Sequence, residues 1–243
     1  MSSNNLPLLD QIRARVSKTL KYGIQLNIST EESKKLLRRH VNRKTNLVIM
    51  FVDINKSTQM SLSLPENRFS LMIQTFAQEI SIAVSGYGGY VFKYEGDAAI
   101  VLFPAEYDQK TACKNALICS TAILETIKKV VNPEFRLNQL PEITLRIGLD
   151  YGNALVVLYG KSLEKAHIDL IGWGISMAAK IASIAQPNQI LAGESICNTL
   201  KSFDKDFLYY SKFVEVDLDP IKWNYPSHVD VGSIYRVYEY LEN

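Results

Sequence analysis

The chain has 243 residues, of which 47% are hydrophobic and 21% are charged, as is usual for a soluble globular protein. Its formal net charge of +2 argues for no nucleic-acid partner, and no apolar run approaches the ~20 residues that a membrane-spanning helix needs. We therefore expect a globular chain without an integral membrane segment.

Cysteine usage and the first residues indicate the compartment. The three cysteines, Cys113, Cys119 and Cys197, are odd in number and show no metal-binding spacing, which favours a reducing environment. The polar start Met-Ser-Ser-Asn-Asn lacks the charged and then apolar segments of a secretory signal. These features predict a cytoplasmic protein.

Residues 1–45 are predicted to form a basic helical extension. Residues 1–46 hold ten Lys or Arg against three Asp or Glu, and apolar residues recur at helical spacing over 7–22. A second basic helix is expected through Arg39. Because these helices carry little apolar surface, we expect them to dock on the body or to pair with a second copy. Their charge leaves open a contact with an anionic surface, although a solvent-exposed helix face is a sufficient explanation.

Residues 46–243 alternate strand and helix patterns and are predicted to form the main body of the protein. The order β-α-β-β-α-β predicts an α+β fold, a ferredoxin-like βαββαβ sandwich with helices on one face of a mostly antiparallel sheet. Its core motifs lie in 46–200, and additional C-terminal strands lie in 204–243. The expected strands are 47–53, a hairpin over 90–103, 143–149, 154–159, 189–192, 208–216 and 234–241, and the expected helices are 65–86, 108–131, 174–185 and 194–201. Strands 143–149 and 154–159 are expected to pair with each other across Tyr151-Gly152-Asn153.

Two aspartates stand where predicted strands begin or end. Asp53 closes the apolar strand, and Asp97 follows the tight turn at Gly96 and opens the second strand of the hairpin. If the two strands are neighbours, the carboxylates lie side by side and make a plausible divalent-metal site of the kind that phosphoryl chemistry needs. Ile54, Ser57 and Thr58 lead into a helix and could offer backbone amides to a phosphate chain. A turn or cap role is the alternative for either aspartate alone.

Four segments, in this order, resemble the class III nucleotidyl cyclases, the catalytic domains of adenylate and guanylate cyclases. They are FVDINKST at 51–58, GGYVFKYEGD at 88–97, LRIGLDYG at 145–152 and DLIG at 169–172. The resemblance covers roughly residues 46–200. Each motif is weak alone, but four in register are specific.

The resemblance implies a two-metal active site. Asp53 and Asp97 would hold two Mg²⁺ or Mn²⁺ ions, with the carbonyl of Ile54 as a further ligand. The ribose 3′-hydroxyl would attack the α-phosphorus, so that pyrophosphate leaves and a 3′,5′-cyclic nucleotide remains. Arg146 matches the arginine of the family that contacts phosphate, and a surface arginine on a strand is the alternative.

The resemblance also implies which base of the substrate is recognised and how the protomers assemble. Lys93 and Asp169 match the positions that read the base, and an ammonium donor with a carboxylate acceptor suits the adenine of ATP. A structural ion pair between these two residues is the alternative. In the family, one protomer supplies the metal aspartates and the other supplies the base-reading pair. We therefore expect a head-to-tail homodimer with sites at the interface.

Two positions depart from the family pattern. Ser176 and Lys180 stand where the family has an Asn that orients the ribose and an Arg that stabilises the transition state. Ser keeps a shorter hydrogen-bonding group, and Lys keeps the charge but loses the planar guanidinium fork. Losing one charge-assisted hydrogen bond costs roughly 1.5–3 kcal/mol, which slows a reaction on the order of 10–150-fold. The departures thus predict a slower enzyme that still turns over.

The leading interpretation is a soluble adenylate cyclase, a lyase that makes cyclic AMP. One alternative keeps the chemistry but changes the substrate to GTP or a pyrimidine nucleoside triphosphate, as in cyclases of phage defence. Another is a regulatory homologue that binds nucleotide without turnover. Trp173 follows Gly172 directly and is expected to pack at the dimer interface.

Overall fold

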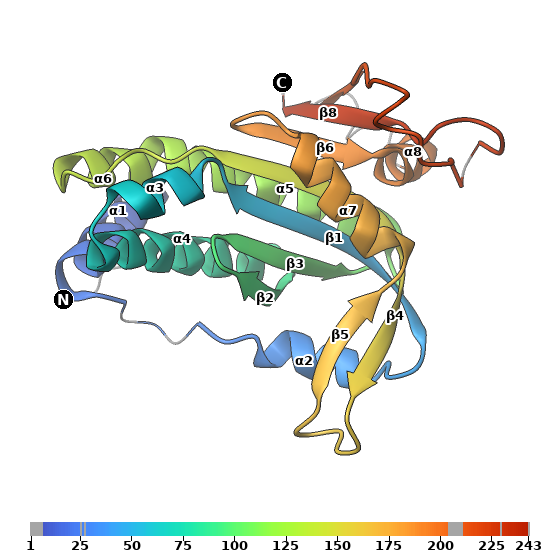
Figure 1. Cartoon of the computed structure of the whole chain (residues 1–243), viewed down its shortest axis with the longest axis horizontal. Coiled ribbons are helices and arrows are strands. Elements are labelled where there is room, and N and C mark those ends of the chain that lie inside the picture. Colours follow the sequence, from blue (N-terminus) through green and yellow to red (C-terminus); the bar gives the residue numbers. More distant parts are fainter. Residues whose placement is uncertain (1–6, 25, 27, 204–210, 229, 243) are drawn as a thin grey trace.

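The protein is built around a single mixed sheet (Figure 1). The structure, a computed structural model, describes residues 7–24, 26, 28–203, 211–228 and 230–242. In these ranges eight strands follow the order β2-β3-β1-β4-β6-β8-β7, with β5 paired to β4. The strands are β1 Lys44–Ile54, β2 Tyr90–Glu95, β3 Ala98–Pro104, β4 Leu145–Tyr159, β5 His167–Ile171, β6 Gln189–Gly193, β7 Ser211–Glu215 and β8 Val237–Glu242. The predicted α+β class is confirmed.

The helices also follow the predicted order, and α3 and α6 are additional short helices. They are α1 Leu8–Tyr22, α2 Glu31–Arg38, α3 Ser57–Ser63, α4 Glu66–Gly86, α5 Gln109–Thr126, α6 Asn132–Leu137, α7 Trp173–Ile184 and α8 Glu194–Phe203. The predicted helix 108–131 ends as α5 plus a π-helical turn, η1 Ile127–Val131, and α6 continues it. No helix in the described ranges is long and apolar enough to cross a membrane.

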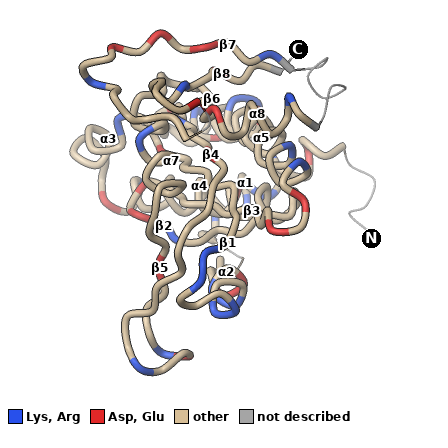
Figure 2. The backbone as a smooth tube through the Cα atoms, turned by 90° about the vertical axis from the view of Figure 1, so that its right-hand side faces the viewer, with Lys and Arg blue, Asp and Glu red and all other residues tan. Residues whose placement is uncertain are grey.

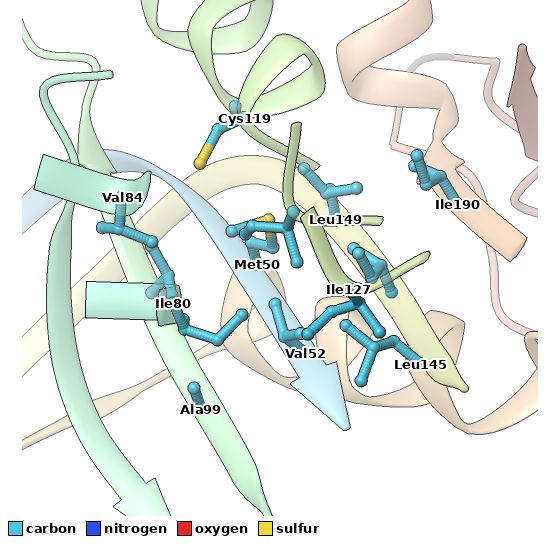
Figure 3. Close-up of a cluster of buried hydrophobic side chains, with 14 of the residues drawn as sticks. Met50, Val52, Ile80, Val84, Ala99, Cys119, Ile127, Leu145, Leu149 and Ile190 are labelled. Atoms are coloured by element: carbon cyan, nitrogen blue, oxygen red, sulfur yellow. The ribbon is translucent and has the colours of Figure 1, made fainter. Parts of the chain in front are cut away.

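The apolar residues of β1 pack on both faces of the sheet, because successive side chains of a strand point to opposite sides. Met50 and Val52 join the larger core, where Ile80 of α4 and Cys119 of α5 pack against them (Figure 3). Ile49 lies in a second apolar cluster on the other face. A strand covered on both sides therefore reads as continuous apolar sequence.

The second face carries helices that the predicted one-sided sandwich did not include. Leu37 of α2 and Ala178 of α7 belong to the cluster that covers it. Gly148 of β4 allows α7 to lie close, since a Cβ built at Gly148 would meet the backbone nitrogen of Ala182 at 2.2 Å. Helix α7 therefore crosses the sheet in direct contact with β4 (Figure 1).

The pairing predicted between 143–149 and 154–159 is wrong. Both segments belong to the single long strand β4, because residues 151–153 keep extended pairing with β1, with Tyr151 opposite Val48 and Asn153 opposite Asn46. The far end of β4 instead pairs with β5, which the sequence analysis did not predict. Asp169 lies on β5, opposite Val157.

The N-terminal helices dock on the body, one of the two arrangements expected for them. Arg15 of α1 donates two hydrogen bonds to the buried carboxylate of Glu79 on α4, at 3.0 and 2.6 Å. Arg38 of α2 donates to the carbonyl groups of Leu163 and Glu164 at the tip of the β4–β5 hairpin, at 3.2 and 3.1 Å. Figure 2 shows basic residues on both α2 and this tip.

The C-terminal strands extend the sheet. β8 pairs antiparallel with β6, and β7 pairs with β8 at the edge. The predicted strand 208–216 corresponds to β7, and its first three residues lie outside the described ranges. The division of the chain at residue 46 stays a prediction.

Candidate active site

The two predicted metal aspartates meet at one end of the sheet. β1 and β3 are antiparallel neighbours, and Asp53 lies opposite Ala98, the residue after Asp97. The backbone N–H of Ile54 donates to the carbonyl oxygen of Asp97 at 3.4 Å, which holds the two strand ends together. The expectation that these carboxylates lie side by side is therefore met.

Arg146 completes this group of charges. It lies opposite Asp53 on the other neighbour of β1, strand β4, and its guanidinium Nη2 forms an ion pair with Asp53 Oδ2. Burial raises the pKa of Asp53, the ion pair with Arg146 opposes this rise, and the adjacent Asp97 adds to it. A neighbouring positive charge therefore stabilises the ionised form of Asp53.

The donor set fits a divalent cation that also binds phosphate. Within the described residues, no group of three or more His, Cys, Asp or Glu could enclose a metal, and Asp53 and Asp97 are two adjacent carboxylates. Mg²⁺ is usually held by one or two carboxylates together with substrate phosphates. Among the described residues, the buried Nε of Arg146 has no hydrogen-bond partner, so the protein leaves this donor unsatisfied.

Ser57 and Thr58 follow at the start of α3, where the chain turns at Lys56 in the left-handed region with φ of 60°. Ser57 is buried, whereas Thr58 is exposed. This places both residues directly after the strand end that carries Asp53 and Ile54. α3 has only seven residues.

The predicted base-reading residues form a pair within one chain. Lys93 Nζ lies 3.3 and 3.4 Å from the two carboxylate oxygens of Asp169 and 3.0 Å from Glu95 Oε1. Burial lowers the pKa of Lys93, but hydrogen bonds and charges from Glu95 and Asp169 outweigh it, so the pKa is raised. Lys93 is therefore a cation held between two acceptors. His167 Nε2 approaches Asp169 Oδ2 at 3.6 Å.

A β-bulge in β2 determines the face of the sheet on which Lys93 lies. The pairing of β2 with β3 shifts between Val91 and Lys93, so that Phe92 is an extra residue and Lys93 lies opposite Ile100. Residues opposite each other in an antiparallel pair share a face, and Ile100 belongs to the second apolar cluster together with Phe92. The bulge thus directs Lys93 to the face that α7 crosses, on which β5 carries Asp169.

Ser176 and Lys180 lie one turn apart on α7, and both are exposed. In the described part of the chain neither the hydroxyl of Ser176 nor the ammonium of Lys180 has a side-chain partner. The structure does not bring them into contact with Asp53 or Asp97 of the same chain.

Sequence reasoning missed two contacts around the base-reading pair. Glu95 follows Lys93 by two residues on the same strand, a spacing that puts side chains on one face and could have identified it. The rings of Tyr159 and His167 stack at 5.9 Å, next to Asp169. This contact depends on the β4–β5 pairing, which carried no clear sequence signal.

The packing of Trp173 differs from a purely interfacial one. Its ring makes edge contacts within the chain with Tyr225, His228 and Tyr235, at centroid distances of 6.4, 4.1 and 5.8 Å. These contacts join the start of α7 to the C-terminal segment.

Solved structures share this fold. An adenylyl cyclase, CyaB from P. aeruginosa, is 17% identical with a TM-score of 0.68, and the similarity covers 83% of this chain and 96% of that one. The guanylate cyclase domain of RhGC from Catenaria anguillulae, in complex with GTP, is 18% identical with a TM-score of 0.66, covering 83% and 99%. At these identities the likeness establishes the fold alone.

Curated relatives and a family model extend the likeness to sequence. Two proteins from Escherichia coli named cytidylate cyclase are 25% identical over 171 residues and 27% over 154 residues, or 68% and 61% of this chain. The matches span only 37% and 34% of those longer proteins. A model described as the adenylate and guanylate cyclase catalytic domain matches residues 40–218. The chain therefore belongs to the adenylate and guanylate cyclase catalytic domain family.

Proposed function

We propose that the chain converts ATP into 3′,5′-cyclic AMP and pyrophosphate. The observation that carries this proposal is the adjacency of Asp53 and Asp97 at neighbouring strand ends, in a chain of the cyclase family. The fold-level likeness to an adenylyl cyclase is consistent with it.

Asp53 and Asp97, with the carbonyl of Ile54, would hold two Mg²⁺ or Mn²⁺ ions. Such ions lower the pKa of the attacking 3′-hydroxyl and offset the charge of the phosphates. Arg146, released from Asp53, would bind the triphosphate, and the amides after Asp53 at Ser57 and Thr58 would lie along it. Asp53 and Asp97 thus anchor the end of the substrate at which the bond forms.

Ser176 and Lys180 would act on the ribose and on the charge of the transition state. The Ser176 hydroxyl can accept or donate a hydrogen bond to a ribose oxygen, and the Lys180 ammonium can stand near the transferring phosphorus. Because both are exposed on α7 and, among the described residues, show no side-chain contact with Asp53, we propose that they serve a site shared with a second copy. The active unit is then a head-to-tail homodimer with two equivalent sites.

The Lys93–Asp169 pair supports a substrate whose base carries an amino group. The Asp169 carboxylate can accept from an exocyclic amine, and the Lys93 ammonium can donate to a ring nitrogen or carbonyl. Adenine and cytosine both present an amine at this position, whereas guanine and thymine-type bases present a carbonyl there. A carbonyl opposite Asp169 would leave two acceptors facing each other.

CTP is the second candidate, and a specific observation favours it. The curated relatives from Escherichia coli, and one from Staphylococcus aureus that is 24% identical over 160 residues, are named cytidylate cyclase. The Lys93–Asp169 chemistry admits cytosine as well as adenine, so base size would decide between the two.

Incubation of the purified chain with Mn²⁺ and each of ATP, CTP, GTP and UTP, followed by chromatography, tests the proposal. We expect a cyclic product from ATP that disappears in Asp97→Ala. A cyclic product from CTP alone would replace ATP by the second candidate. If no triphosphate gives a product while nucleotide binding persists, the chain is a regulatory homologue and the proposal fails.

A further inference from the structure

A cleft lies away from Asp53 and Asp97, between α8, the start of α7 and the middle of β4. Its volume is about 570 Å³, and the residues that line it include Asn46, Asn153, Trp173, Ser195 and Asn198. Figure 2 shows the side of the molecule on which α7, α8 and β4 come together. The volume falls within the range of about 300–1,000 Å³ that is usual for small-molecule sites.

The cleft is distinct from the proposed catalytic centre. Asn46 lies seven residues before Asp53 on β1, and a strand rises ~3.3 Å per residue, so the two are roughly 23 Å apart. Neither Lys93 nor Asp169 lines the cleft. A molecule bound there would not occupy the metal or base positions of the same chain.

Four polar side-chain groups of the cleft lack partners among the described residues. In the described part of the chain, the side-chain amides of Asn46, Asn153 and Asn198 make no hydrogen bond. The buried Nε1 of Trp173 also has no acceptor. Each amide offers one acceptor and two donors, so the cleft presents both kinds of group to a ligand.

The charge of the lining limits what can bind. Among the described residues that line the cleft there is no Lys, Arg, Asp or Glu, and His228 is its one ionisable side chain besides Tyr151. A phosphate or carboxylate would find no fixed cation to offset its desolvation, which is costly for an unpaired charge. Trp173 and His228 supply aromatic rings at a centroid distance of 4.1 Å.

A buried network fixes one wall. The hydroxyl of Ser195 lies 2.9 Å from the phenol oxygen of Tyr235, which donates to Asp150 Oδ1 at 2.7 Å. Asp150 is fully buried and also accepts from the backbone N–H of Tyr151 at 2.9 Å. Ser195 is thereby held in one orientation, so that part of the cleft is formed before any ligand arrives.

We propose that this cleft binds an uncharged, hydroxyl-bearing ring compound, either a nucleoside or a sugar. Amides and hydroxyls suit ring hydroxyls and base edges, aromatic rings suit flat or apolar ring faces, and the absence of fixed charge disfavours phosphorylated forms. An occupant would contact Trp173, the first residue of the helix that carries Ser176 and Lys180.

The test is calorimetry or ligand-observed NMR on the whole chain with adenosine, cytidine or glucose, each at about 1 mM and without divalent metal. We expect at least one of these probes to bind. Its phosphorylated form, which is the nucleoside monophosphate or glucose 6-phosphate, should bind about tenfold more weakly. Asn198→Ala, or the exposed Asn153→Ala if the first does not fold, should weaken binding about tenfold. Asp169→Ala should leave it unchanged.

If adenosine or cytidine binds and glucose does not, the ligand is a nucleoside. If only glucose binds, the ligand is a sugar. Binding of none of the three probes overturns the proposal. So does binding that is lost in Asp169→Ala but kept in Asn198→Ala, because the probe then occupies the base-reading site. Binding is measured without turnover, so failure of the cyclase activity would leave this result intact.

Discussion

Arg146 and Asp53 form an ion pair across the two central strands of the sheet, β4 and β1. The same carboxylate is the predicted ligand of a divalent cation, and its neighbour Asp97 adds negative charge. If a cation binds Asp53 on the side that Arg146 now occupies, we expect Arg146 to move away. Such an exchange would free Arg146 for a substrate phosphate.

Removal of Arg146 should strengthen metal binding and weaken catalysis. In Arg146→Ala the two carboxylates lose their internal cation, so Mn²⁺ affinity without nucleotide is expected to rise about tenfold, the scale of one charge-assisted hydrogen bond. Cyclase turnover should fall, because the triphosphate loses a partner. Mn²⁺ binding by electron paramagnetic resonance measures the first effect. Arg136→Ala, which removes an exposed ion pair with Glu142, is the matched control. Unchanged or weaker Mn²⁺ binding in Arg146→Ala would contradict the exchange.

Asp169 should determine which bases are accepted. Asp169→Ala removes the acceptor for an exocyclic amine, so the preference for ATP or CTP over GTP and UTP should shrink by about tenfold or more. The measurement is kcat/KM for each triphosphate. His167→Ala is a useful comparison, because His167 approaches Asp169 at 3.6 Å but is largely exposed. If Asp169→Ala lowers all four rates equally, the Lys93–Asp169 pair is structural.

Lys180 should limit the rate through its geometry rather than its charge. Lys180→Arg restores a planar fork of donors and is expected to raise kcat severalfold, whereas Lys180→Ala should lower it about tenfold or more. Both changes lie on an exposed position of α7, so folding should be unaffected. Ser183→Ala, exposed on the same helix, serves as the control. Equal kcat values in the wild type, Lys180→Arg and Lys180→Ala would exclude a role of this side chain in stabilising the transition state.

The sequence predicted that Asp53 and Asp97 lie at neighbouring strand ends, because the signals for these ends are local. An apolar run ending in Asp53 and a glycine turn before Asp97 determine two strand ends, and the antiparallel order of the sheet brings them together. The β4–β5 hairpin could not be predicted in the same way. Five residues at 167–171 with alternating polarity make a weak strand signal, and the glycine at 152 suggested a turn although its backbone stays extended.

Features that depend on long-range contacts also escaped prediction. The bulge at Phe92 arises from the register of β2 against β3, which no local pattern in β2 specifies. The ion pair of Arg146 with Asp53 joins residues 93 positions apart. Both determine where a predicted site residue points, so the sequence alone could not give the orientation of Lys93 or the partner of Arg146.

Asp150 should make stability fall as pH rises. Burial raises the pKa of Asp150 to about 7, hydrogen bonds from Tyr235 and Tyr151 oppose this rise, and Glu194 adds to it. The unfolded chain loses this proton near its ordinary value of 3.8, whereas the folded chain keeps it. The stabilisation is therefore fully present below about pH 4, declines by about 1.4 kcal/mol per pH unit up to about pH 7, and is constant above that.

Asp150→Asn tests this dependence, because it keeps the acceptor for Tyr235 but cannot ionise. The unfolding free energy of the variant minus that of the wild type, from urea denaturation, should increase between about pH 5 and about pH 7 and then level off. The difference cancels the titration of other groups, such as Glu194. A difference that stays constant over this range would mean that Asp150 is ionised in the folded protein.

Mixing two inactive variants should restore activity if the sites are shared between protomers. Within one chain, Asp53 pairs with Arg146 and Lys93 pairs with Asp169, so each half-site holds together without the other. In a hybrid dimer of Asp53→Ala with Lys93→Ala, one site combines both defects and the other combines both intact halves. Since about half of randomly mixed dimers are hybrids with one working site, about a quarter of wild-type activity is expected.

Asp53→Ala mixed with Asp97→Ala is the control, because both changes fall in the same half-site and no hybrid dimer has an intact site. Differently tagged chains allow hybrid dimers to be counted, and an inactive Asp53→Ala–Lys93→Ala hybrid that is present in full yield would show that each chain builds its site alone.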